Sequence, residues 1–446
     1  MPDGRVVTGK VVLTVDDDRR VLSPGWVGLA GDGTIAAVGG GPPPAGATVA
    51  AGGDVVMPGL ISAHEHLVDV LVRGGPVGPT FLDWLLGTYH AGLAHARPEE
   101  CAAAVGLVRA ADLAAGVTSV VDCWSVGPVD DATRVAECAE ASASAHLASG
   151  GRTVFAAMCC EVVPDGWSHP AIDVARLCRP IDDSLAATAD LAARLGGPRL
   201  TVTPSPELPE MSTAGGMQAA LALAERLDAV LPMHVCASPP SRAAWCPAAL
   251  EAIGVLGPRL LAADCSAVDD ADVRRLGAAG IGVAHCPSAS RRLGGTTWTP
   301  LAALRAAGAR GGLGLDNRSL HSGHDLFVEA RQARLVAAGQ AAVLDAPALL
   351  DLLTREAAAA AGLGDVTGAL TVGRRADLVV LDAGGPHWWP RAASWVDAVV
   401  ECAVAADVRC VLVDGRVVAT DGRSLVTVDP AAVDAAGRRI RAAMNW

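Results

Sequence analysis

Two histidines separated by one residue, His64 and His66, stand at the end of an apolar run in the segment VVMPGLISAHEHL. Successive side chains of a β-strand point to opposite faces, so a strand here would direct both imidazoles to the same side. Two imidazoles at one strand end can supply two ligands of a divalent metal ion. Glu65 would face the other side, where we expect it to be structural or to support the ligands through hydrogen bonds.

Three further polar residues follow apolar runs and precede loops. His234 follows AVLPM, His285 follows GIGVA and Asp316 follows GGLGL. A lone histidine at such a place is often structural, but here several imidazoles and a carboxylate share the pattern. Nitrogen and oxygen ligands of this kind suit zinc, iron or manganese, and no thiolate is needed. We therefore expect one divalent metal ion, with zinc as the first choice and iron or manganese as alternatives.

Distant parts of the chain must come together to form such a site. Between residues 57 and 365, strand-like runs such as TSVVDCW, PRLTVTPS and RLLAADC alternate with alanine-rich stretches of helical length. This alternation, repeated about eight times, predicts an α/β fold with a parallel (β/α)8 barrel of the TIM type. The carboxyl ends of barrel strands meet at one mouth, where active sites lie. The barrel would therefore gather the histidines and the aspartate around that mouth.

The two ends of the chain read as short strands with turns that contain glycine and aspartate. The simplest packing is one small β-sandwich domain built from both ends. The predicted division is 1–56 and 366–427 for the two parts of the β-sandwich, 57–365 for the metal-dependent catalytic barrel, and 428–446 for a C-terminal helix.

Composition excludes several classes of protein. Of the 446 residues, 51% are hydrophobic and 19% are charged, which rules out an intrinsically disordered chain. The net charge of −13 argues against a nucleic-acid partner, because phosphate binding needs a basic surface. No long apolar stretch predicts a membrane span, and the N-terminus lacks the apolar core of a signal peptide. Twelve cysteines without a CxxC pair indicate reduced thiols, so we expect a cytoplasmic protein that acts on a small molecule.

From end to end, the chain resembles the amidohydrolase superfamily. Within it, the chain is similar to the group of triazine hydrolases, cytosine and guanine deaminases, and methylthioadenosine/S-adenosylhomocysteine deaminases. The segments that carry the resemblance are MPGLISAHEHL, PMHVCAS, LLAADCSAVDD, VAHCPSASRRLGG, GLGLDNRSLHSGHDLFVEARQA, TGALTVGRRADLVVLD and VRCVLVDGRVVATDGR. The resemblance implies a barrel with a split β-sandwich and a homodimer or larger homo-oligomer.

The same resemblance implies a mononuclear metal held by His64, His66, His234 and Asp316, all of which this chain has. Lys10 is the only lysine of the chain. A barrel lysine that could carry a metal-bridging carbamate is therefore absent, which argues against the binuclear subtype of the superfamily.

Two positions depart from the pattern of these deaminases. The resemblance implies a glutamate three residues after His234, where this chain has Ala237, and a histidine at the end of the sixth strand, where it has Asp264. That glutamate carries a proton to the substrate in the family, so another group must do so here. We expect Asp316 to accept the proton of the water and Asp264 to carry the second proton. The alternative for Asp264 is a structural ion pair.

Four loop residues are candidates for substrate binding. Trp84 could stack on a planar substrate, His285 could line the pocket, and Arg291 could bind a carboxylate. His321, in the loop after Asp316, could contact the substrate or supply the missing proton carrier. The structural alternatives are core packing for the tryptophan, a solvated arginine and a polar loop histidine.

The resulting hypothesis is a metal-dependent hydrolase, of deaminase or amidohydrolase type, that cleaves a C–N bond of a small cyclic substrate through activated water. The two departures leave open a non-hydrolytic metal-dependent enzyme on the same scaffold, such as a lyase, isomerase or cyclase, because Lewis-acid activation needs no attack by water. A non-catalytic relative is less favoured, because all four implied metal ligands are present.

Overall fold

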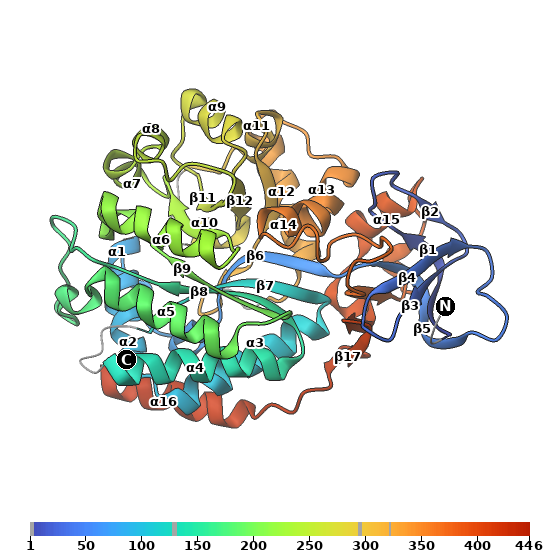
Figure 1. Ribbon diagram of the computed structural model, residues 1–446, viewed down its shortest axis with the longest axis horizontal. Helices are drawn as coiled ribbons and strands as arrows, with labels where there is room; N and C mark the ends of the chain where they lie inside the picture. Colours follow the sequence, from blue (N-terminus) through green and yellow to red (C-terminus); the bar gives the residue numbers. More distant parts are fainter. Residues whose placement is uncertain (1–3, 127–131, 293–296, 321–322) are drawn as a thin grey trace.

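The computed structural model describes residues 4–126, 132–292, 297–320 and 323–446. Figure 1 shows an elongated molecule in which parallel strands and helices fill the larger part, and a sheet of early (blue) and late (red) strands fills the smaller part. Within the described residues, no helix is both long enough and apolar enough to cross a membrane.

Five parallel strands form one sheet in the order β14-β6-β7-β8-β9. Every residue of β6 and β7 is buried, and strands covered on both faces read as nearly continuous apolar runs. The bounds are Leu60–His66 for β6, Val117–Trp124 for β7, Arg152–Met158 for β8, Leu200–Ser205 for β9 and Asp316–Asn317 for β14.

Four more parallel strands form a second sheet in the order β10-β11-β12-β13. Their bounds are Leu231–Val235, Leu260–Asp264, Gly282–His285 and Arg310–Leu313. The α/β class with parallel sheets, predicted from the alternation of strand-like and helical segments, is confirmed.

The two parallel sheets adjoin at two seams. At the first, the Ser205 hydroxyl at the end of β9 donates to the carbonyl of Pro232 in β10 (2.8 Å). At the second, the backbone N–H of Leu315 donates to the Ser62 hydroxyl of β6 (3.3 Å). Leu315 lies between β13 and β14, so a short stretch of chain passes from one sheet to the other.

Helices connect successive strands and begin at side chains that suit helix starts. Pro98 opens α3, and the Asp269 carboxylate accepts backbone N–H groups of Ala271 and Asp272 at the start of α9. The helix bounds are Pro98–Ala114 for α3, Ala132–Ser149 for α4, Ile181–Leu195 for α5, Ala214–Arg226 for α6, Pro239–Ala244 for α7, Pro247–Ala252 for α8, Asp270–Ala278 for α9, Pro287–Arg292 for α10, Leu301–Ala306 for α11, Leu326–Gly339 for α12, Ala346–Leu353 for α13 and Arg355–Ala360 for α14.

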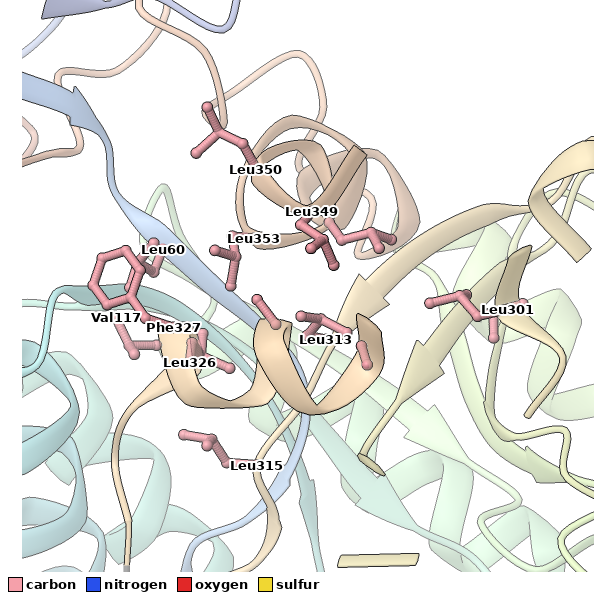
Figure 2. Close-up of a cluster of buried hydrophobic side chains, with 14 of the residues drawn as sticks. Leu60, Val117, Leu301, Leu313, Leu315, Leu326, Phe327, Leu349, Leu350 and Leu353 are labelled. Carbon is pink, nitrogen blue, oxygen red and sulfur yellow. The ribbon is translucent and has the colours of Figure 1, made fainter. Parts of the chain in front are cut away.

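An aliphatic core holds the later helices against the strands. Figure 2 shows Leu326 of α12 and Leu349 and Leu353 of α13 around Leu60 of β6 and Leu313 of β13. All five side chains are fully buried. Leucines dominate this core because aromatic residues make up only 3% of the chain. Their packing fixes β6 beside β13, which matters because both strands lead to candidate site residues.

Both ends of the chain contribute to one nine-stranded sheet, in the order β18-β17-β16-β15-β5-β1-β3-β4, with β2 paired to β1. The early strands meet the late ones where β5 pairs with β15 in antiparallel register. The bounds are Arg5–Leu13 (β1), Val21–Leu22 (β2), Gly25–Leu29 (β3), Ile35–Gly40 (β4), Thr48–Pro58 (β5), Leu378–Leu381 (β15), Val408–Val413 (β16), Arg416–Thr420 (β17) and Arg423–Ser424 (β18). Helix α15 (Trp395–Cys402) lies between β15 and β16 in the chain, and α16 (Pro430–Met444) ends it.

A buried ion pair ties this sheet to the parallel strands. Arg152, at the start of β8, donates from Nε to Asp377 (2.9 Å) and from a terminal nitrogen to Asp414 (2.8 Å). The arginine and Asp377 are almost fully buried. A buried charge that loses its partner is strongly destabilising. This contact should therefore resist separation of the nine-stranded sheet from the parallel strands.

Replacing Asp377 by alanine should therefore lower the free energy of unfolding by about 3 kcal/mol, because Arg152 loses its buried partner. Urea denaturation followed by circular dichroism would measure it. Asp190→Ala, which removes an exposed ion pair with Arg194, is the control and should leave the midpoint unchanged. Equal midpoints for both variants would contradict the assigned role of the buried pair.

Candidate metal centre and substrate cavity

Three histidines from two strands face one another at the carboxyl ends of the parallel strands. His64 and His66 end β6, and His234 lies near the end of β10. The ring centres of His64 and His66 are 4.7 Å apart, and those of His64 and His234 are 4.9 Å apart. One ligand nitrogen from each ring lies within 4.8 Å of the other two. The predicted alternation along β6 thus brings both of its histidines to one side.

Backbone carbonyls orient two of these rings. His66 Nδ1 lies 2.8 Å from the carbonyl oxygen of Cys123, and His234 Nδ1 lies 3.0 Å from that of Glu207. A carbonyl can only accept, so Nδ1 carries the proton in each ring and Nε2 keeps its lone pair. His64 Nε2 is buried and has no hydrogen-bond partner among the described residues. A metal ion would be the missing partner of these Nε2 lone pairs.

A carboxylate enters the same space from the neighbouring strand. β14 pairs with β6 so that Asp316 lies opposite Glu65. Asp316 Oδ1 is 3.4 Å from His64 Nε2 and 3.5 Å from His66 Nε2. Three imidazole nitrogens and one carboxylate oxygen are a donor set that fits a divalent metal ion such as zinc.

Burial keeps the two imidazoles of β6 in the form that binds metal. Desolvation lowers the pKa of His64 and of His66 to about 3, so both rings are neutral near pH 7. Metal ligation requires neutral imidazole, so no proton has to leave these two rings before a metal binds. The pKa of His234 is instead raised: desolvation lowers it, but the carboxylates of Asp264, Glu207 and Asp316 outweigh that effect.

Asp264 provides a second carboxylate beside the histidines. It ends β11, and its Oδ2 lies 3.9 Å from His234 Nε2. Burial raises the pKa of Asp264 above its ordinary value. A carboxylate with a raised pKa next to a reaction site is suited to carry a proton.

The backbone is unusual at these strand ends. Cys236, Asp264, Cys265 and Asp316 all have positive φ angles, between 50° and 71°. Residues other than glycine rarely adopt this conformation, and where they do, the surroundings must hold them there. We conclude that the fold keeps this strained backbone because it places the side chains of the site.

A cavity of about 510 Å³ opens beside the histidines. Asp264, Asp316 and Ala237 line it, and the alanine leaves space where a glutamate is expected from the resemblance. Trp84 also lines it and is 2% exposed. It ends helix α1 (Phe81–Trp84), which continues as a π-helix over Leu85–His90. Trp84 also belongs to a buried hydrophobic cluster, so its position is compatible with both the stacking and the core-packing prediction.

The structure places the remaining predicted residues as follows. His285 ends β12 with both ring nitrogens buried and unpartnered among the described residues, and it does not lie among the described residues that line the cavity. Arg291 belongs to α10, but its side chain lies outside the described part of the structure. His321 also lies outside it. Nothing further is assigned to these two side chains.

Glu65 faces away from the three histidines into a buried charged cluster. Its Oε2 lies 3.7 Å from Nε of Arg318, and Arg318 donates to Asp112 (2.8 Å). Arg318 follows Asp316 by two residues, so this cluster joins the backbone of β6 to that of β14 from behind. Glu65 therefore supports the ligand-bearing strands, which corresponds to the structural one of its two predicted roles.

Glu207 is a site residue that sequence reasoning missed. Its carbonyl accepts both the backbone N–H and Nδ1 of His234, at 2.8 and 3.0 Å, and its carboxylate Oε1 lies 3.4 Å from His66 Nδ1. The side chain lines the cavity, and burial raises its pKa to about 7. A weaker signal was present, because Glu207 follows the strand-like run LTVTPS with only Pro206 between them, whereas the predicted ligands follow their runs directly.

Known proteins resemble this chain over nearly its whole length. A model described as the Amidohydrolase family matches residues 55–418. A 5-methylthioadenosine/S-adenosylhomocysteine deaminase of Syntrophobacter fumaroxidans is 31% identical, over 97% of this chain and 95% of the relative. A 5'-deoxyadenosine deaminase of Methanosarcina acetivorans is 28% identical over 94% of each chain.

Solved structures share the fold. An adenosine deaminase from Xanthomonas campestris with bound zinc has a TM-score of 0.82 at 24% identity, over 99% of this chain and 98% of the other. An atrazine chlorohydrolase from Arthrobacter aurescens complexed with zinc has a TM-score of 0.81 at 21% identity, over 98% and 99%. With the family model covering most of the sequence, the chain belongs to the amidohydrolase family.

Proposed function

We propose that the protein is a zinc-dependent hydrolase that cleaves an exocyclic C–N bond of a small aminated heterocycle and releases ammonia. The observation that carries the proposal is the meeting of three imidazoles and two carboxylates beside a cavity with room for a small ring and its substituents. Relatives named as deaminases of adenosine derivatives support this reaction type over the lyase, isomerase and cyclase alternatives.

In this proposal His64, His66, His234 and Asp316 hold the metal. Zinc is favoured because it accepts mixed nitrogen and oxygen ligands in tetrahedral sites, and because two structural neighbours carry it. A divalent metal ion held there supplies Lewis acidity, which lowers the pKa of water and polarises the carbon under attack.

Protein groups then move the two protons of the hydrolysis. Asp316 can accept the proton of the attacking water. Its Oδ1 contacts the two histidines of β6, whereas its second oxygen does not take part in these contacts. Asp264 can deliver a proton to the leaving nitrogen, because its raised pKa favours a protonated carboxyl. Ala237 can carry no proton, so Asp264 takes over the task assigned to a glutamate in the related deaminases.

The substrate roles follow from the cavity. Trp84 would stack on the ring of the substrate. The substrate-binding roles of His285, Arg291 and His321 stay predictions, as do a cytoplasmic location and a homodimeric or larger assembly.

The proposal extends to the architecture. We infer that the two parallel sheets are arcs of one (β/α)8 barrel over residues 57–365, because side-chain hydrogen bonds bridge both seams. The nine-stranded sheet would then correspond to the small β-sandwich domain of residues 1–56 and 366–427, followed by the helical segment 428–446.

The reaction type is tested with the zinc-loaded protein and a panel of aminopurine nucleosides, aminopyrimidines and aminotriazines. Enzyme-coupled detection should find ammonia in a 1:1 ratio to the hydroxylated product for at least one compound. A substrate that is converted without ammonia release and without an oxygen atom from water in the product would instead favour a non-hydrolytic enzyme.

The metal site is tested by His234→Ala and Asp316→Ala. Each variant should retain less than about a tenth of the wild-type metal after dialysis and should lose turnover, because a ligand is missing. Elemental analysis per chain gives the metal content. His387→Ala, which alters a partly exposed imidazole outside the site, is the control and should bind metal normally. Full metal content in both ligand variants would refute the site.

The role of Asp264 is tested by Asp264→Asn. Turnover should fall by about 10²–10⁴-fold, because the amide cannot transfer the proton, while the metal content stays that of the wild type. Asp264→Glu should restore part of kcat. A variant that loses metal together with activity would show that Asp264 is needed for metal binding and not for proton transfer.

A further inference from the structure

The cavity beside the histidines has an unbalanced charge. Four carboxylates line it, from Glu207, Glu210, Asp264 and Asp316, and the described lining residues include no arginine or lysine. A divalent metal ion adds two positive charges to these four negative ones, so ionised carboxylates would still exceed it by two. The excess negative charge must be neutralised by protons or by a ligand.

Two of the carboxylates have oxygens with no partner. Oε2 of Glu207 and Oε2 of Glu210 are buried and accept no hydrogen bond from the described residues. Glu207 is 5% exposed. Glu210 is half-buried and belongs to the 3-10 helix Pro209–Met211, which follows Glu207 in the chain. Burying an acceptor without a donor is costly, so the described residues leave these two carboxylates poorly compensated. Both side chains line the cavity, where a ligand can supply donors to the carboxylates.

Aromatic side chains line the same cavity. Phe81, Trp84 and Tyr89 form a contiguous group, with ring centres of neighbouring pairs 6.0 and 5.6 Å apart, and Trp167 also contributes. Aromatic faces attract cations, and together with carboxylates they form a typical environment for an ammonium or guanidinium group. Planar nitrogen bases can stack on the same rings.

We propose that Glu207 and Glu210 form a cation-binding subsite, so that the substrate is a nitrogen base with an ammonium, amidinium or guanidinium group. The inference rests on the proposed function, since it assigns the substrate class of that site. The cationic group donates to the carboxylates of the two glutamates, which line the cavity, while the aromatic residues cover its apolar part.

The subsite is tested with two probes of the same shape that differ in charge. Benzamidine carries an amidinium group, and benzamide carries a neutral amide. Isothermal titration calorimetry would compare their dissociation constants in the zinc-loaded wild-type protein and in the variants Glu207→Gln, Glu210→Gln and the double variant. Glu225→Gln, at an exposed position of α6, is the matched control for the loss of one negative charge.

Benzamidine should bind the wild type about tenfold more tightly than benzamide, and the double variant should lose this preference, with little change for benzamide. The control variant should keep the preference. Circular dichroism and metal content would show whether each variant is folded, and the single variant at half-buried Glu210 keeps the test decisive if the double variant is not.

Three results would overturn the subsite: no benzamidine binding at millimolar concentration, equal binding of the two probes, or a preference that survives in the folded Gln variants. The ammonia assay separates this inference from the proposed reaction. A protein that deaminates neutral nucleosides but binds both probes equally refutes the subsite alone. A protein that prefers benzamidine through its glutamates but releases no ammonia refutes the reaction alone.

Discussion

A buried imidazole must satisfy two ring nitrogens, and the site is organised around this requirement. At His66 and His234 a backbone carbonyl takes the Nδ1 proton, which leaves both Nε2 atoms directed at a shared space. The carbonyls belong to Cys123 on β7 and to Glu207 after β9, so neighbouring strands set the ring orientations. Asp316 can join them only because β14 pairs with β6 in the observed register. The parallel sheets therefore determine ligand geometry through main-chain atoms.

The acidic character of the cavity gives meaning to the two departures from the related deaminases. The resemblance implies a glutamate where this chain has Ala237, and in this structure Asp264 and Glu207 bring carboxylates to the cavity from β11 and from the end of β9. Left-handed backbone at Asp264 and Asp316 shows that these positions are held against a local conformational cost.

The sequence allowed prediction of the parallel α/β class and of the strand ends that carry His64, His66, His234 and Asp316, because both depend on short-range periodicity. The same rule selected His285, whose buried ring ends β12 and does not belong to the described cavity lining, so its substrate-binding role stays a prediction. Glu207 escaped prediction because its role depends on a turn beyond the strand. The strand order of the nine-stranded sheet depends on pairing between the two ends of the chain, for which the sequence carries no local signal.

The pairing of β5 with β15 has a consequence for the nascent chain. During synthesis, β5 leaves the ribosome long before β15 exists, although it leads through Gly59 directly into β6. One edge of β5 thus stays open while the parallel strands assemble, and open edges invite pairing with other chains. The sheet is completed only when strands β15 to β18 return to the early strands. A chain that stalls before them leaves an unpaired strand edge that chaperones would need to shield.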